Sequence, residues 1–272
     1  MKSNILQAVC LTHIGKRINH EDNFLFYGNY LTSDIQKRMS DNNCICINKD
    51  IPSRVSLFVI SDGMGGHNAG EVASRICVET LAQKEKELQE CFSLEEAVAC
   101  LQVCIKEIND IVCRISYKSS ECKGMGATLV LLVVYEGEYA ILNVGDSRAY
   151  FFRESSLLQI TKDHTEGQRM LDLGLLTRKE LANFPARKNL NRYIGYGDFG
   201  YVLQADEYYP TIEDGIVMIC SDGVSDFLSE KKILDILQSG TELENIGKKL
   251  IKEAVANQNA DNTTIILIQT RG

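Results

Sequence analysis

The stretch Ser61-Asp62-Gly63-Met64-Gly65-Gly66 follows directly on the apolar run Val55-Ser56-Leu57-Phe58-Val59-Ile60. Apolar, β-rich residues that end at glycines are typical of a buried strand closed by a tight turn. The sequence therefore predicts that Asp62 lies at a strand end. Glycines permit positive φ angles and a close approach to the backbone, so the Asp62 carboxylate and the Gly63 carbonyl could reach one cation. The simpler alternative is an ordinary Asp-Gly turn.

Three further aspartates have the same setting beside an apolar run: Asp146, Asp222 and Asp261. One such turn is common, but four aspartates at strand ends, far apart in the chain, indicate one acidic site assembled by the fold. Clustered carboxylates repel one another unless divalent cations lie among them. Ligand sets made only of oxygen favour hard ions such as Mg²⁺ and Mn²⁺ over zinc or copper.

Composition limits the remaining possibilities. The 272 residues are 44% hydrophobic, which suits one large domain over residues 1–272. A net charge of −8 argues against nucleic acid as a partner. No window approaches 18 continuous apolar residues, and the N-terminus lacks the apolar stretch of a signal peptide. We expect a cytoplasmic monomer without a membrane segment.

The ten cysteines include no C-x-x-C pair, and several occupy apolar positions of helix or strand patterns. Such cysteines are usually reduced and behave as small hydrophobic side chains. Two alternatives with redox activity stay open, the Cys44-x-Cys46 pair and a Cys91/Cys122 pair.

Runs of strands interrupted by paired helices predict an α+β domain with antiparallel sheets. Helices are expected over 69–88, from the capping box at Ser93 onward, and over 230–237 and 242–256. Strands are expected over 5–11, 55–60, 127–134, 138–144, 149–153, 157–161, 216–220 and 263–268.

Three polar segments remain. In the loop 15–22, Arg17 beside Glu21 and Asp22 would suit a phosphate held next to a metal, although a surface ion-pair loop is the simpler reading. Residues 29–54 are expected to form a surface insertion without chemistry. Residues 165–194 are expected to be helical and charged. Their Arg187, Lys188 and Arg192 could attract a phosphorylated partner or form an ordinary solvated face.

Seven motifs occur in an order that resembles the metal-dependent protein phosphatases, the type 2C Ser/Thr phosphatases, in their bacterial form. They are Arg17-x-x-x-Glu21-Asp22, Ser61-Asp62-Gly63-Met64-Gly65-Gly66-His67, Gly124-Met125-Gly126-Ala127-Thr128, Gly145-Asp146-Ser147-Arg148, Asp163-His164, Ser221-Asp222-Gly223 and Asp261-Asn262. The resemblance spans nearly the whole chain. It implies a four-layer αββα sandwich, two packed antiparallel sheets flanked by helix pairs.

The resemblance also implies roles. Asp62 would bridge two Mn²⁺ or Mg²⁺ ions, with Asp222 and Asp261 at the first and the Gly63 carbonyl at the second. Asp22, and Glu21 largely through water, would act at the second ion. A third, weaker ion would lie at Asp146 with Asp222. Arg17 would bind the phosphate, and residues 165–194 would form a flap that influences substrate choice.

The implied activity is hydrolysis of phosphoserine and phosphothreonine by a metal-activated water, opposing a bacterial Ser/Thr kinase. Position 20 is His where the family often has Asn, and position 64 is Met where many eukaryotic members have a His thought to protonate the leaving group. His20, His67 and a metal-bound water stay open as the acid. A catalytically weak phosphoprotein-binding module, or a phosphatase dedicated to one partner, are the alternatives.

Overall fold

A computed structural model of the chain describes residues 5–39, 44–49, 54–65, 69–197, 200–240 and 242–270. The strands are β1 Ile5–His13, β2 Asp22–Phe26, β3 Cys44–Lys49, β4 Val55–Met64, β5 Gly126–Ala127, β6 Leu129–Tyr135, β7 Glu138–Val144, β8 Arg148–Arg153, β9 Ser156–Gln159, β10 Asp206–Tyr208, β11 Gly215–Cys220 and β12 Thr263–Thr270. The helices are α1 Ser33–Arg38, α2 Gly70–Leu88, α3 Leu94–Lys118, α4 Glu166–Asp172, α5 Arg178–Leu181, α6 Asp222–Ser225, α7 Glu230–Gln238 and α8 Leu243–Val255, with a 3-10 turn η1 at Ser120–Cys122.

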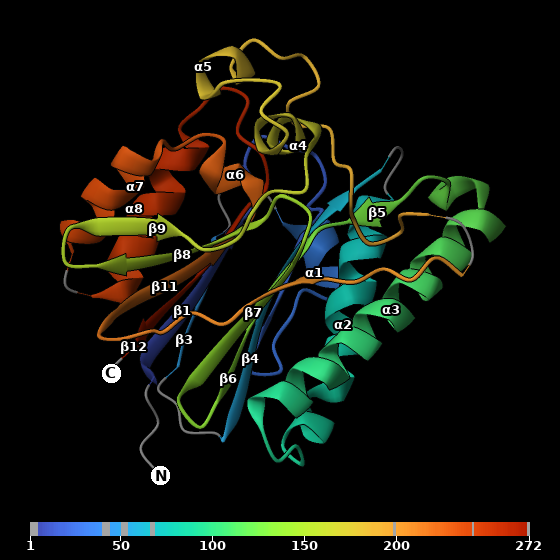
Figure 1. The fold of residues 1–272 in the computed structure, drawn as a ribbon, viewed down its shortest axis with the longest axis horizontal. Coiled ribbons are helices and arrows are strands. Elements are labelled where there is room, and N and C mark those ends of the chain that lie inside the picture. Colours follow the sequence, from blue (N-terminus) through green and yellow to red (C-terminus); the bar gives the residue numbers. More distant parts are fainter. Residues whose placement is uncertain are drawn as a thin grey trace.

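The strands form two antiparallel sheets that lie face to face (Figure 1). One sheet has the order β3-β1-β12-β11-β8-β9, and the other has the order β10-β7-β6-β4-β2 with β5 beside β4. Helices α2 and α3 cover the outer face of the second sheet, and α7 and α8 cover the outer face of the first. The predicted α+β fold and its four-layer αββα sandwich are confirmed.

Alternation along β4 explains why its sequence is a continuous apolar run. Phe58 and Ile60 point into the core between the sheets, while Leu57 and Val59 point toward α2 and α3. Both faces of the strand are therefore buried, as in any sheet covered on two sides.

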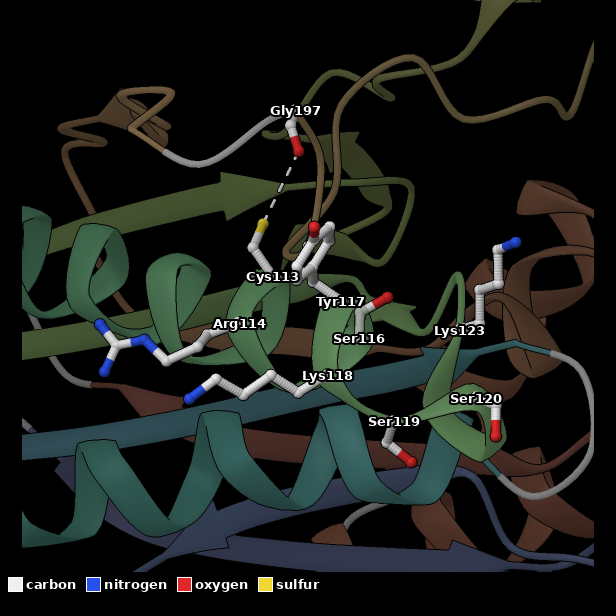
Figure 2. Close-up of a pocket in the computed structure, with 10 residues that line it drawn as sticks. Cys113, Arg114, Ser116, Tyr117, Lys118, Ser119, Ser120, Lys123 and Gly197 are labelled. Atoms are coloured by element: carbon white, nitrogen blue, oxygen red, sulfur yellow. Dashed lines mark hydrogen bonds between the residues drawn. The ribbon is translucent and has the colours of Figure 1, made fainter.

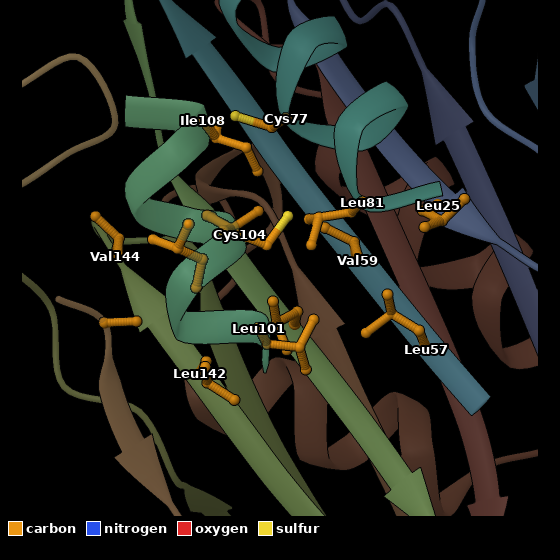
Figure 3. Close-up of a cluster of buried hydrophobic side chains, with 14 of the residues drawn as sticks. Leu25, Leu57, Val59, Cys77, Leu81, Leu101, Cys104, Ile108, Leu142 and Val144 are labelled. Atoms are coloured by element: carbon orange, nitrogen blue, oxygen red, sulfur yellow. The ribbon is translucent and has the colours of Figure 1, made fainter. Parts of the chain in front are cut away.

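The helical layers bury equally apolar faces. Figure 3 shows Leu81 of α2 and Leu101 of α3 meeting Leu57 and Val59. Cys77 belongs to the same buried cluster as a free thiol, as expected for a reduced cysteine. Truncating a fully buried leucine in such a layer typically costs about 2–5 kcal/mol of unfolding free energy.

The cysteine alternatives are only partly visible. Cys91 and Cys122 are both free thiols. The sulfur 4.0 Å from Cys91 Sγ is that of Cys100, which is also a free thiol. Of the Cys44-x-Cys46 pair, Cys46 is a half-buried free thiol, and the side chain of Cys44 lies outside the described residues.

The prediction for residues 29–54 is wrong in part. The segment contains α1 and also β3, which pairs with β1 as the edge strand of its sheet. Strand β2 begins at Asp22, inside what was expected to be a loop. The expected charged helix over 165–194 is reduced to the short α4 and α5, joined by turns.

The predicted tight turn at Asp62 is also wrong. Strand β4 continues to Met64, because Asp62 pairs with Asp22 of β2 and Gly63 pairs with Ala127 of β5. Gly66 and His67 lie outside the described residues. Among the helices that the structure describes, none combines the length and the apolar character needed to cross a bilayer.

Candidate active site

Five aspartates from five segments meet at one end of the sandwich. Asp62 and Asp22 face each other across neighbouring antiparallel strands. Asp146 follows β7, Asp222 begins α6 after β11, and Asp261 stands two residues before β12. Because β7 runs parallel to β4 within its sheet, and β11 and β12 are antiparallel neighbours, these strand ends lie on the same side. The predicted convergence is thus present in the fold.

The electrostatics confirm how close these carboxylates are. Burial and then the charges of Asp22, Asp222 and Asp146 raise the pKa of Asp62 well above its ordinary value. Burial, with the charge of Asp222, raises the pKa of Asp146 to about 8. Asp62 and Asp222 also affect the pKa of each other, and two carboxylates so close together need a proton or a counter-charge between them. A cation would serve the same purpose.

One carboxylate oxygen of Asp22 accepts hydrogen bonds from two hydroxyl groups, and the other has no partner. Ser221 Oγ and Thr264 Oγ1 each donate to Asp22 Oδ2 at 2.7 Å. Asp22 Oδ1 is buried and has no hydrogen-bond partner. Burial raises the pKa of Asp22 to about 7, against the lowering effect of the two hydroxyl groups. A buried carboxylate oxygen without a partner is costly, and a hard cation would satisfy it.

A chain of hydrogen bonds behind Asp22 fixes the state of His20. Thr264 donates its only hydroxyl proton to Asp22, so it accepts from Thr12 Oγ1 at 2.7 Å. Thr12 then accepts from His20 Nε2 at 2.9 Å. Burial lowers the pKa of His20 to about 3. His20 is therefore neutral at pH 7, and its one ring proton is held in the hydrogen bond to Thr12, so the ring is not an acid for a leaving group.

The Asp62 backbone is fixed by Thr128. Thr128 Oγ1 accepts from the Asp62 amide at 3.0 Å, and the Thr128 amide donates to the Asp62 carbonyl at 2.8 Å. Gly145, with φ of +106°, packs so closely on Thr128 that a Cβ would lie 2.7 Å from its side chain. The motifs that contain Thr128 and Gly145 therefore both help to fix the backbone of Asp62.

A glycine is required at position 63 because the backbone of Gly70 lies against it, and not because its φ angle is positive as the sequence suggested. Its φ is not among the positive ones, and a Cβ there would lie 2.1 Å from the Gly70 carbonyl oxygen. The missing side chain lets the start of α2 contact β4. Glu21 lies beside this contact, and burial raises its pKa to about 7, with the charges of Glu71 and Asp261 adding to the shift.

Arg17 lies at the edge of the aspartates with a half-exposed side chain, and its guanidinium forms an ion pair with Asp261. Of the other cations, Lys188 pairs with Asp226 and Arg192 pairs with Asp206. Arg192 is thereby directed to His164 and β10, while Arg187 and Lys188 line a cavity of about 240 Å³ beside Asp146 and Asp222.

As the side chains stand, no three His, Cys, Asp or Glu residues of the described ranges are arranged to hold a metal ion. Asp62 and Asp222 lie close enough to affect the pKa of each other, and Asp261 forms an ion pair with Arg17. The donor set nevertheless fits a hard divalent ion, because it consists of oxygen atoms, shares protons at neutral pH and leaves Asp22 Oδ1 unsatisfied.

Several contacts around the site had no predicted role. Asn262 accepts from the Glu21 amide at 2.7 Å and donates to the Ile14 carbonyl at 2.7 Å, which ties the Arg17 loop to β12. Arg148 makes two hydrogen bonds to the Asp163 carboxylate, at 2.8 and 2.6 Å. These residues lie in motifs that the sequence showed, but only the fold identifies their partners.

Comparison with known proteins identifies the family. The family model described as protein phosphatase 2C matches residues 31–263. The chain belongs to the protein phosphatase 2C family. Members of this family are metal-dependent Ser/Thr protein phosphatases, and this chain is such an enzyme.

The relatives agree in sequence and in structure. The Listeria monocytogenes serine/threonine phosphatase stp is 31% identical over 235 residues, which cover 86% of this chain and 91% of that protein. The crystal structure of serine/threonine phosphatase Stp1 from Staphylococcus aureus matches with a TM-score of 0.80 at 28% identity, covering 100% of this chain and 99% of that one. The catalytic domain of PstP in complex with 2 manganese ions matches with a TM-score of 0.74 at 25% identity, covering 98% of this chain and 100% of that one.

Proposed function

We propose that this phosphatase hydrolyses phosphoserine and phosphothreonine in proteins at a binuclear Mn²⁺ or Mg²⁺ centre, opposing a bacterial Ser/Thr kinase. The observation that carries the proposal is the cluster of five aspartates, in which burial raises the pKa of Asp22, Asp62, Asp146 and Asp222 and leaves one carboxylate oxygen unsatisfied. The listeria and staphylococcal relatives, which bear the name Ser/Thr phosphatase, support the substrate class.

In this proposal Asp62, Asp222 and Asp261 would hold the first ion, and Asp62, Asp22 and the Gly63 carbonyl would hold the second. Glu21 acts at the second ion through water. Asp146 with Asp222 holds a third, weaker ion. When bound, the ions supply Lewis-acid activation of the attacking water and neutralise charge on the phosphoryl oxygens.

The chain's own residues then position the substrate. Arg17 exchanges its partner Asp261 for the phosphate, for which a planar and always charged guanidinium is suited. Thr128 and the hydroxyl groups on Asp22 hold the aspartates in place. Residues 165–194 act as a flap, because α4 and α5 border the cavity next to Asp146.

The test is hydrolysis of p-nitrophenyl phosphate and of matched phosphothreonine and phosphotyrosine peptides, with and without Mn²⁺ and after EDTA. We expect turnover only with added metal and a preference for phosphothreonine over phosphotyrosine. A folded protein that hydrolyses none of the three under any metal, yet binds the phosphopeptides, would instead be the catalytically weak binding module.

A further inference from the structure

A large basic cavity lies outside the acidic site, at the C-terminal end of α3. Its volume is about 1020 Å³, and its walls are the last two turns of α3, η1 and the chain near Gly195 and Gly197 (Figure 2). Three cations line it, namely Arg114, Lys118 and Lys123. No acidic side chain among the described residues lines it. On a chain with a net charge of −8, such a cavity calls for a specific explanation.

A helix-stabilising role explains only part of this charge. A lysine in the last turn complements the partial negative charge at the end of a helix, which accounts for Lys118. Lys123 comes after η1 and lies outside that turn. Neither lysine forms an ion pair with a described residue, whereas Lys84, Lys162 and Lys188 all do. The exposed Glu121 is a chain neighbour but does not line the cavity.

The cavity also offers groups that bind a peptide chain. Tyr117 is 93% exposed. Figure 2 shows its ring between Lys118 and the loop at Gly197. Such a ring supplies apolar contact area at a low cost in side-chain entropy. The hydroxyl groups of Ser119 and Ser120 line the cavity and can bond peptide groups.

The cavity is close to the acidic site along the chain. Gly126, three residues after Lys123, is paired with Met64, which is two residues from Asp62. Chain geometry alone keeps the Lys123 and Asp62 Cα atoms within about 23 Å of each other. About six or seven extended residues span that distance. Tyr193 packs on Gly126 and on Tyr196, at 5.3 Å between ring centroids, and so forms part of the intervening surface.

We infer that this cavity binds an acidic segment of the phosphoprotein substrate, about four to seven residues from the phosphorylated side chain. The inference rests on the proposed function, since it names a feature of the substrate for the same active site. Surface charges of this kind act over about 8–10 Å at moderate ionic strength, so they favour carboxylates in the cavity over neutral residues.

The test compares the wild type with Lys118→Glu/Lys123→Glu. The matched control is Lys106→Glu, an exposed lysine of α3 that lies about two turns before Cys113, the first residue of the cavity wall, and forms no ion pair with a described residue. The substrates are p-nitrophenyl phosphate, a phosphothreonine peptide with alanines at positions 4–7 on both sides, and the same peptide with aspartates there. We expect kcat/KM for the aspartate peptide to fall at least tenfold in the double variant. The other two substrates and the control variant should keep their wild-type values.

Each result has one meaning. Equal kcat/KM of the wild type for the two peptides, or an equal loss on both in the double variant, overturns the inference while leaving the phosphatase intact. If the wild type does not hydrolyse p-nitrophenyl phosphate or either peptide with any metal, the proposed function is rejected instead. Raising the salt concentration should reduce the wild-type preference for the aspartate peptide, and a preference that resists salt also contradicts the charge argument.

Discussion

At the scale of single residues, Asp62 is the side chain on which the acidic site depends. Burial and then the charges of Asp22, Asp222 and Asp146 raise the pKa of its carboxyl group well above the ordinary value. We expect Asp62→Ala to lower kcat for p-nitrophenyl phosphate by a factor on the order of 10³ or more, as when a central electrostatic group is removed. Steady-state kinetics with saturating Mn²⁺ check this. Near-normal turnover in the variant would contradict the bridging role.

Arg17 should behave differently, because it is proposed to bind the phosphate and lies at the edge of the site. We expect Arg17→Ala to raise KM for p-nitrophenyl phosphate about tenfold or more with a smaller change in kcat, since a charge-assisted contact is worth about 1.5–3 kcal/mol. Lys16→Ala is the matched control, because Lys16 is an exposed neighbouring cation. A fall in kcat without a change in KM would contradict a role in substrate binding and would indicate that Arg17 acts in the chemical step.

Residue-level prediction from sequence succeeds where a residue is marked by its neighbours. Asp146 and Asp222 each follow a strong apolar run, so a strand end could be assigned to both without coordinates, whereas β4 continues two residues beyond Asp62. The partners of Asp22 could not be assigned. Thr264 is 242 residues away in the chain, and only the packing of the two sheets brings its hydroxyl group to the carboxylate.

At the scale of elements, the junction between β4 and α2 depends on the absence of a side chain. Because a Cβ on Gly63 would overlap the Gly70 carbonyl, we expect Gly63→Ala to cost roughly 3 kcal/mol or more of unfolding free energy and to lower activity. The matched control is Gly174→Ala, whose φ of +67° is strained but whose surroundings are open. It should cost about 1–2 kcal/mol.

Urea unfolding of the two glycine variants and the wild type measures this difference. Equal midpoints for Gly63→Ala and Gly174→Ala would show that a shift of α2 costs no more than the backbone strain at Gly174, and would contradict the prediction that the Gly63–Gly70 contact fixes this junction. A metal-dependent rescue of Gly63→Ala stability would show that the ions, and not the packing, hold the junction.

The elements that sequence missed are short or polar. Strand β10 has three residues, and β3 lies in a segment whose composition resembles a loop. Both strands form because a neighbouring strand, β7 or β1, offers its free edge. Helices α2 and α8 were predicted to within one residue at each end, and the start of α3 to within one residue, since their apolar periodicity is strong.

At the scale of the whole molecule, the fold brings acidic groups together at a cost in stability. Burial is the main cause that raises the pKa of Glu21 and Asp22 to about 7 and of Asp146 to about 8. An acid whose folded pKa exceeds its unfolded pKa stabilises the protein at low pH, and that contribution is lost as the pH rises through the folded value. Without divalent metal, stability should therefore fall as the pH rises from the ordinary carboxyl pKa of about 4 to about pH 8, and it should level off above that pH.

Above pH 6.5 the loss of stability caused by the carboxyl groups can be measured separately from the effect of the buried His20. The lowered pKa of His20 makes stability fall with decreasing pH only below its ordinary value of 6.5. Urea midpoints of the EDTA-treated protein across this pH range check the prediction. We expect the unfolding free energy to decrease by up to about 1.4 kcal/mol per pH unit for each carboxyl that titrates.

Added Mn²⁺ should remove most of this decrease, because a divalent ion stabilises the charged carboxylates and binds the folded state preferentially. Asp62→Asn is the matched variant, since it keeps the size of the side chain and removes one charge from the cluster. Its metal-free form should lose less stability with rising pH than the wild type and should respond less to Mn²⁺. A metal-free wild type whose midpoint rises from pH 6.5 to 8 would mean that the carboxyl groups of Glu21, Asp22 and Asp146 do not have the raised pKa values that their burial in the fold requires.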